Sequence, residues 1–174
     1  ALHAQVEEIL SREAPTQLSR RVHHAAGSDN AQRVLSLAPL AAAQSAGLGS
    51  HLEAASHLST ALKYVREAEP ELAANLYENW AYEAGIALKI DDSIIAARHK
   101  AIALWRELGR VDKVGLNLRW LSRLHWYRGE AREAETYVAE AVRELEAIKP
   151  GPELAMAYSA LSQMHMLHDR AEEA

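Results

Sequence analysis

The sequence contains no cysteine. Disulfide bonds, cysteine-ligated zinc and a thiol nucleophile are therefore excluded together. Long apolar runs are missing too, since no stretch reaches the roughly 18 residues that a transmembrane helix needs. No basic segment followed by an apolar one opens the chain, so we read no secretory signal. These absences fit a reducing compartment, and we expect a cytoplasmic protein with no membrane partner.

Clustered basic charge is also missing. Nineteen Lys and Arg residues face 24 Asp and Glu residues, which gives a formal net charge of −5 over 174 residues. Phosphate contacts need clustered Lys and Arg, so we expect no direct nucleic-acid binding. The chain begins at Ala1, and residues 170–174 resemble the opening turn of a helix. We therefore expect this chain to be a piece of a longer protein.

Phenylalanine is absent, whereas alanine makes up about a fifth of the chain. Leu, Glu and Arg are also common. These residues favour helices, and the β-branched and aromatic residues typical of strands are scarce. The composition predicts an all-α fold.

Four segments align without gaps at a spacing of forty residues. One column marks an interruption of the apolar pattern and holds Gly49, Lys89, Gly129 and Asp169. The other columns hold small or apolar residues: Ala54/Ile94/Ala134/Ala174, Ala61/Ala101/Ala141, Leu62/Ile102/Val142, Val65/Trp105/Leu145 and Ala41/Ala81/Leu121/Leu161. Agreement in so many columns predicts an internal repeat.

Apolar residues within each repeat recur at helical spacing, as Ile94, Ala97 and Ala101 do. Gly- and Pro-containing segments separate the runs where turns are expected. The predicted helices are Leu2–Arg12, Thr16–Ala26 (opened by Pro15), 31–46, 51–67, 71–88, 92–108, 112–128, 131–148 and 152–167. One antiparallel helix pair cannot bury its apolar face alone, so we expect the pairs to stack into an α-solenoid.

The predicted organisation has two parts. Residues 1–30 form a short helical lead-in, and residues 31–174 form the repeats. The repeat units lie near 31–70, 71–110, 111–150 and 151–174, the last one truncated. A truncated unit leaves an apolar face uncovered after residue 167, so we expect self-association through that end.

The repeat resembles the tetratricopeptide repeat. In that family the second helix carries small residues seven positions apart, and the first carries a Leu-small pair with Gly at the next turn. The matching residues here are Ala54/Ala61, Ala134/Ala141 and Leu121-Ser122 with Gly129. Ala81-Tyr82 with Lys89 departs from the pattern. The resemblance covers residues 31–174 and implies a tetratricopeptide-like α-solenoid of antiparallel helix pairs, with a period of 40 in place of about 34.

A narrower resemblance comes from local segments of the chain. These segments are Leu18 to Asp29, Val34 to Ala42, Gly49 to Leu62, Arg98 to Leu108 and Leu118 to Trp126. They look like the helical-repeat region of large LuxR-type bacterial transcriptional regulators. In that family the region lies between a signal-transduction NTPase module and a helix-turn-helix. The resemblance implies that this chain is the sensor or arm segment and that residues 1–30 are a linker or the tail of a winged helix. The chain contains no Gly-x-x-x-x-Gly-Lys-Ser/Thr loop of its own.

Histidine is the residue type that most suggests a metal site. His125 and His165 share a repeat column, and His168 follows the second of them. His23 and His24 are adjacent, so we expect them on different helix faces, unable to chelate as a pair. No His-Glu-x-x-His motif occurs, and no Glu is followed three residues later by His. We therefore interpret the histidines as neutral core residues and expect no metal and no cofactor.

Carboxylates and serines give no catalytic pattern. The glutamates of residues 131–148 run along one helix, as on a solvated face with i, i+4 partners. No Gly-x-Ser-x-Gly segment is present. We expect the chain not to be an enzyme.

The stronger candidate is a binding groove on the concave side of the solenoid. By the tetratricopeptide resemblance, outward positions of the first helix of each pair would line it. The candidate residues are Asn79 and Glu83, then Arg119, Arg123, Trp126 and Tyr127, then Gln163, with Ile86, Ala87, Ser159, Met166 and Leu167 beside them. Arg119, Arg123 and Tyr127 are spaced i, i+4, i+8 and share a face. Two guanidiniums beside an indole and a phenol suit a carboxylate or phosphate and a flat group.

Several interpretations stay open at this point. The first is a non-catalytic ligand-sensing or protein-interaction domain of a LuxR-type regulator, whose partner is a protein, a peptide or a small-molecule effector. The second is a free-standing adaptor or peptide receptor. The third and least favoured is a helical enzyme with a metal near His125 and His165. If the groove has no binding role, Trp126 packs inside and both arginines pair with Glu83 or Glu130.

Overall fold

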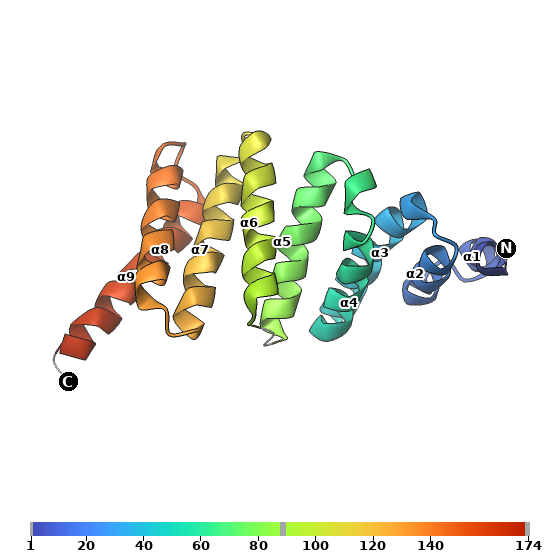
Figure 1. The fold of residues 1–174 in the computed structure, drawn as a ribbon, viewed down its shortest axis with the longest axis horizontal. Coiled ribbons are helices and arrows are strands. Elements are labelled where there is room, and N and C mark those ends of the chain that lie inside the picture. The colour runs from blue at the N-terminus through green and yellow to red at the C-terminus, as the bar shows by residue number, and fades with distance from the viewer. Residues whose placement is uncertain (1, 88–89, 173–174) are drawn as a thin grey trace. The chain divides into compact units, whose positions relative to one another are not determined.

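The computed structural model describes residues 2–87 and 90–172, with side chains up to Met166. Over these residues the protein is all-α, with nine α-helices, one short 3-10 helix and no strand (Figure 1). The chain divides into two compact units, Ala1–Lys89 and Ile90–Ala174. This division falls inside the predicted unit 71–110, and the forty-residue unit limits stay a prediction.

The first unit holds five α-helices among its described residues. They are α1 (Leu2–Glu13), α2 (Leu18–Gly27), α3 (Ala31–Gly47), α4 (His51–Leu62) and α5 (Pro70–Ile86), with the 3-10 helix η1 (Val65–Glu67) between the last two. Each helix packs on its neighbour in the chain. Two predicted bounds are wrong. The helix predicted over 51–67 ends at Leu62, since Tyr64 leaves helical geometry and its hydroxyl donates a hydrogen bond to Asp29 Oδ1 at 3.0 Å. Pro15 lies in the turn before α2 and does not open it.

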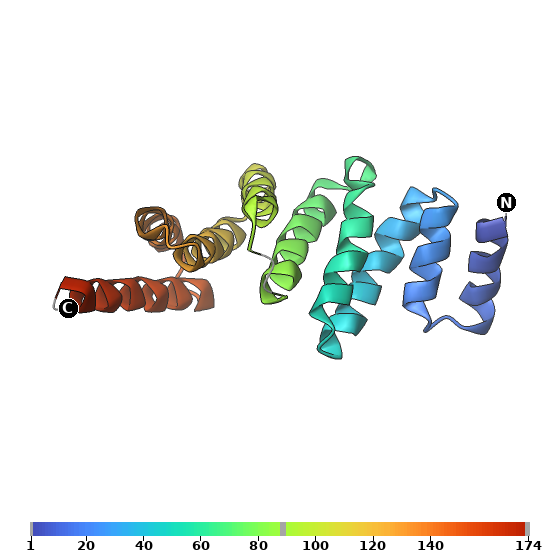
Figure 2. The same cartoon turned by 60° about the horizontal axis from the view of Figure 1, so that its bottom comes forward.

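The second unit holds α6 (Asp92–Glu107), α7 (Val111–Tyr127), α8 (Ala131–Glu146) and α9 (Pro152–Glu172). Helix α6 packs on α7, which packs on α8, and α9 contacts both α7 and α8. Figure 2 shows α9 crossing beside the α7–α8 pair. The predicted helix bounds are confirmed here to within two residues, except at the end of α9. The predicted self-association after residue 167 depends on side chains outside the described part.

Four turns between helices share one hydrogen-bond pattern. The residue with left-handed backbone is Asp29, Gly49, Gly109 or Gly129, with φ of 52°, 77°, 67° and 75°. The amide after it donates to a carbonyl five residues earlier, as from Glu130 to His125 at 2.9 Å. The left-handed residue itself donates to a carbonyl three residues earlier. This is the Schellman motif, in which glycine is favoured because it lacks a Cβ.

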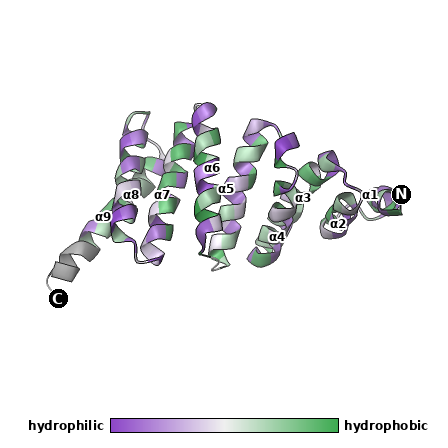
Figure 3. Cartoon of the chain, in the orientation of Figure 1, coloured by the Kyte–Doolittle hydropathy of each residue, from purple (hydrophilic) through white to green (hydrophobic). Residues whose placement is uncertain are grey.

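Hydrophilic and hydrophobic residues alternate along the helices that Figure 3 colours. None of the described helices combines the length and the apolarity that crossing a bilayer would require. The buried stripe is rich in small residues: Ala38, Ala41, Ala54 and Ala61 in the first unit are all at 0 % exposure. Small side chains let helix axes approach closely, and the packing of α7 on α8 has this character.

Gly115 marks a close approach of α7 to α8. A Cβ added there would overlap Cγ and both Cδ atoms of Leu145, which is 2 % exposed. At Gly85, also helical, an added Cβ would have no described atom within 4 Å beyond its own helix backbone and chain neighbours. The same substitution should therefore have opposite effects at the two positions.

We expect Gly115→Ala to destabilise the protein by about 1 kcal/mol. Overpacking costs about 1–3 kcal/mol, and the gain in helix propensity offsets about 1 kcal/mol of that. Gly85→Ala, the matched control, should stabilise by about 0.5 kcal/mol. Urea unfolding followed by circular dichroism measures both changes. Equal shifts of the two midpoints in the same direction would contradict the prediction.

Candidate functional site

A groove of about 330 Å³ lies between α7 and α9. Its α7 side carries Arg119, Ser122, Arg123, Trp126 and Tyr127, and its α9 side carries Met156, Ser159, Ala160, Gln163 and Met164. Five of the seven principal groove residues predicted from the sequence therefore lie together. They are Arg119, Arg123, Trp126, Tyr127 and Gln163.

Helix periodicity aligns the cationic and aromatic residues of α7. Arg123 donates a hydrogen bond from Nε to the Tyr127 hydroxyl at 2.8 Å, and its Cζ lies 5.4 Å from the centre of that ring. The Cζ atoms of Arg119 and Arg123 also lie 5.3 and 5.5 Å from the ring centre of Trp120. Both guanidiniums are thus held by aromatic faces, which fixes their planes and leaves N–H donors for a ligand.

Arg119 sits in an environment that disfavours its charge. Partial burial lowers the pKa of Arg119, the neighbouring charge of Arg123 lowers it further, and Glu153 acts in the opposite direction. Since an arginine side chain stays protonated in proteins, the cost appears as an unfavourable free energy of the cation. An anion bound in the groove would relieve that cost.

Two buried polar atoms of the groove residues have no hydrogen-bond partner within the described part of the chain. They are Nε of Arg119 and Oγ of Ser122. Ser122 is only 1 % exposed, yet it belongs to the groove lining. Buried polar atoms are usually paired, so these two mark where a ligand or an ordered water would bind.

If the groove had no binding role, both arginines were expected to pair with Glu83 or Glu130. Among the described side chains, no carboxylate lies within ion-pair distance of Arg119 or Arg123. Glu130 is occupied by His125 Nδ1 at 2.5 Å and by Arg128 Nε at 3.0 Å. Glu83 accepts a hydrogen bond from His51 Nδ1 at 2.8 Å. Trp126 is partly buried against the core formed by Ala134, Val138 and Met164, and it still lines the groove.

Asn79 and Glu83 do not belong to this groove. Both lie on α5, in the first unit, whereas every residue of the groove comes from the second. Ile86 and Ala87 also lie in the first unit, and Met166 is exposed outside the lining. The side chain of Leu167 lies outside the described residues. A groove that joins Asn79 and Glu83 to the α7 residues would span both units, and it stays a prediction.

Residues of α9 that the sequence argument missed are Met156, Ala160 and Met164. Together with Ser159 and Gln163 they recur at intervals of three and four and so form one face of the helix. The repeat alignment predicts a groove position for Ser159 and Gln163 on this helix, but it does not single out the three apolar residues beside them.

A second groove, of about 340 Å³, lies between α4 and α5. It is lined by Leu52, Ala55, Ser56, Ser59, Trp80, Ala84 and Ala87. Among the described residues, no charged side chain contributes to its lining, so these residues offer little to fix the orientation of a polar ligand. The α7–α9 groove is therefore the better candidate.

His125 is buried and hydrogen-bonded locally, as predicted for a core histidine, whereas His165, His23 and His24 differ from their predictions. His125 binds Glu130, and its ring stacks on Tyr137 with centroids 5.1 Å apart, while His165 is exposed on α9. The side chain of His168 lies outside the described residues. His23 and His24, expected on different faces, have ring centroids only 5.1 Å apart. Adjacent helical positions diverge at Cα, but rotation about the side-chain torsions brings the rings back together.

Neither a protein-family model nor a curated protein matches the chain. Among solved structures, the crystal structure of BtubC (BKLC) from P. vanneervenii is similar, with a TM-score of 0.64. The two chains share 21% sequence identity, and the match covers 88% of this chain and 67% of BtubC. A likeness at this identity shows the all-helical fold alone.

Proposed function

We propose that the α7–α9 groove binds an anionic group beside an apolar one, and that the chain is a non-catalytic ligand-sensing or protein-interaction domain. The observation that carries the proposal is the pair Arg119 and Arg123. Both line the groove, and no carboxylate among the described residues lies within ion-pair distance of either. A carboxylate or phosphate placed between them accepts charge-assisted hydrogen bonds and relieves their mutual repulsion.

The remaining lining residues suit the rest of such a ligand. Ser122, Ser159 and Gln163 offer hydrogen bonds, and Trp126 with Met164 offers an apolar wall. Methionine adapts to irregular shapes, which suits a groove that accepts a side chain or a small metabolite. The ligand we propose is therefore a small carboxylate or phosphate, or the acidic segment of a peptide.

Binding there would act on helix packing. A ligand held by Arg119 and Arg123 on α7 and by Gln163 on α9 bridges two helices that already contact each other. If the α7–α9 spacing has two states, the ligand shifts their populations by its difference in affinity for them. The chain thus has a physical means to convert binding into a change of shape.

We further propose that the chain is a cytoplasmic, tetratricopeptide-like solenoid segment of a LuxR-type regulator, in which signal binding is coupled to an NTPase and a DNA-binding module. Support comes from the sequence resemblance and from burial of the repeat columns. Ala54 and Ala61 on α4, and Ala134 and Ala141 on α8, are all at 0 % exposure, as expected for the second helix of such a repeat.

The second candidate function is a free-standing adaptor that binds an acidic peptide. It is favoured by the exposure of Tyr127 (54 %) and Met156 (49 %) beside the arginines, because a bound peptide would cover these two side chains. The gene around this segment distinguishes the two candidates. A phosphate-binding loop upstream and a helix-turn-helix downstream are expected for the regulator and not for the adaptor.

Thermal-shift screening tests the binding proposal, because a ligand that binds the folded state raises the melting temperature. The probes are inorganic phosphate, succinate, ADP and a glutamate-rich peptide. We expect at least one probe to raise Tm, with its affinity then measured by calorimetry. Arg119→Ala or Arg123→Ala should weaken that binding about tenfold or more, because each removes a charge-assisted hydrogen bond.

Arg132→Ala is the matched control, since Arg132 is an exposed arginine on α8 outside the groove. It removes the same charge and should leave the affinity unchanged. A flat screen, or an equal loss of binding in Arg132→Ala, would overturn the proposal.

A further inference from the structure

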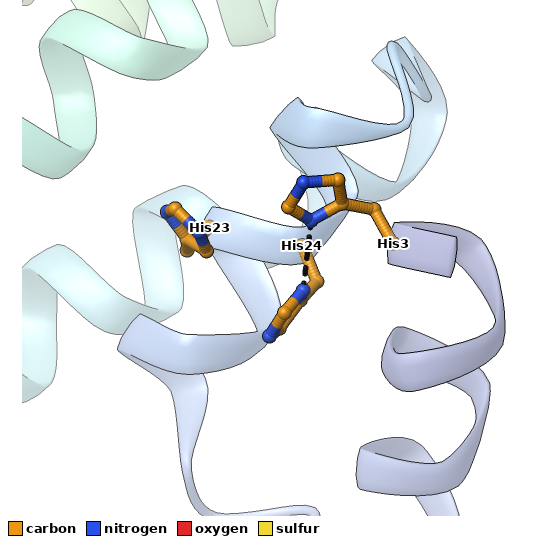
Figure 4. A group of neighbouring side chains, drawn as sticks. All are labelled: His3, His23 and His24. Carbon is orange, nitrogen blue, oxygen red and sulfur yellow. Dashed lines mark hydrogen bonds between the residues drawn. The ribbon is translucent and has the colours of Figure 1, made fainter. Parts of the chain in front are cut away.

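Three histidine side chains from two helices meet near the start of the chain (Figure 4). His3 lies on α1, and His23 and His24 lie on α2. The ring centroids of His3 are 5.6 Å from His23 and 5.1 Å from His24. One nitrogen of each ring lies within 4.8 Å of a nitrogen of each other ring. In the described part of the chain, no other group of three such ligands is found.

The position of His3 depends on Gly27, the last residue of α2. A Cβ added at Gly27 would lie 2.7 Å from Nδ1 and 2.8 Å from Cε1 and Cγ of His3. The imidazole therefore rests directly on the bare backbone of the glycine. In this position, His3 Nδ1 is 2.9 Å from His24 Nδ1.

The hydrogen bond between His3 and His24 requires that at least one ring be neutral, because two imidazolium rings have no lone pair to share. Burial, together with the charges of His23, His3 and Arg20, lowers the pKa of His24. The neutral imidazole is the form that binds metals.

We propose that His3, His23 and His24 bind one late divalent transition-metal ion and that the ion joins α1 to α2. Imidazole nitrogen is a preferred ligand of Zn²⁺, Cu²⁺ and Ni²⁺. Ligand nitrogens in a tetrahedral zinc site lie about 3.3 Å apart, given bonds of about 2.0–2.1 Å. The His3–His24 pair is already within this separation.

Only a small rearrangement completes the site. His23 is exposed and can rotate toward the other two rings without disturbing the core. The ring that donates the His3–His24 hydrogen bond moves its proton from Nδ1 to Nε2 when Nδ1 takes the metal. Solvent fills the fourth position, as in zinc sites with three protein ligands. The bound ion then cross-links residues 3 and 23 and holds α1 against α2.

Calorimetric titration of the tag-free chain with Zn²⁺ tests the site. We expect one ion per chain, and about a tenfold or greater loss of affinity in each of His3→Ala, His23→Ala and His24→Ala. The control is His165→Ala, which removes an exposed histidine on α9 and should bind Zn²⁺ like the unaltered protein.

Gly27→Ala gives an independent test, because it keeps all three imidazoles and displaces only the His3 ring. We expect about a tenfold weaker affinity for Zn²⁺ with an unchanged or higher Tm in the absence of metal, since alanine favours the helix. The proposal is overturned if His3→Ala and Gly27→Ala bind as tightly as the unaltered chain. It is equally overturned if His165→Ala loses as much affinity as the three ligand variants.

Discussion

Trp105→Ala should lower the free energy of unfolding of the second unit by about 3–5 kcal/mol. Trp105 lies on α6 with 0 % of its surface exposed, and it is the largest fully buried side chain in the described structure. Its removal leaves a cavity that the surrounding helices fill only in part. The substitution also removes the contacts of the indole ring with the cations of Arg110 and Lys113, whose Cζ and Nζ atoms lie 5.7 and 5.5 Å from the ring centre.

The control for Trp105→Ala is Leu108→Ala, three residues further along the chain. Leu108 is 39 % exposed, so its truncation should cost less than about 1 kcal/mol. Guanidinium titrations of both variants, followed by circular dichroism, give the two values. The assignment of Trp105 to the core is wrong if the two variants unfold at the same midpoint.

Glu7→Ala should release α1 from the first unit. The Glu7 carboxylate accepts hydrogen bonds from Arg21 Nη2 at 3.1 Å and Nε at 3.3 Å, and it lies 3.5 Å from Arg33 Nε. The side chains of Glu7 and Arg21 are only 8% and 10% exposed. Removing one partner of a buried pair leaves an uncompensated charge and costs about 3–5 kcal/mol. Because the pair joins α1 to α2, we expect the loss to appear as faster amide hydrogen exchange in residues 2–13.

The neighbouring Glu8 supplies the matched control. It forms an exposed i, i+4 pair with Arg12, and such pairs contribute little. Glu8→Ala should change stability by less than about 0.5 kcal/mol and leave the exchange of α1 unchanged. The double substitution Glu7→Leu with Arg21→Met should restore the protection, because it removes both buried charges. If Glu7→Ala and Glu8→Ala give the same exchange rates, the pair does not secure α1.

The helices were predictable from sequence because their signals are local. Apolar spacing gives the buried stripe, and Gly49, Gly109 and Gly129 supply the left-handed residue that ends a helix. Asp29 takes the equivalent role without being glycine, the residue that usually marks such a turn. The 3-10 turn after Leu62 has no such local marker, and the hydrogen bond from Tyr64 there reaches Asp29, thirty-five residues away.

The part of the candidate site that lies on one helix, α7, was predictable from the sequence. Residues Arg119, Arg123 and Tyr127 share a face because helix geometry alone requires it. Their meeting with Gln163 depends on how α9 crosses α7, and the repeat alignment anticipated that contact. Asn79 and Glu83 lie in the other unit of the chain, so their place in one continuous groove stays a prediction.

The histidine cluster shows what local signals leave out. His3 reaches His24 only because Gly27 has no side chain and α1 docks at one angle. A glycine at the end of a helix normally indicates helix termination, and the spacing of residues in the sequence does not indicate that an imidazole will cover it. Such a site is visible only after the helices are packed.

The four shared turns also bear on how quickly the chain folds. Each one reverses the backbone within about three residues, so a helix meets its packing partner almost as soon as both have formed. Contacts between neighbours in sequence require only short loop closures, and proteins dominated by such contacts fold in microseconds to milliseconds. The search for native pairings inside each unit is accordingly brief, and little apolar surface stays exposed to other chains while it proceeds.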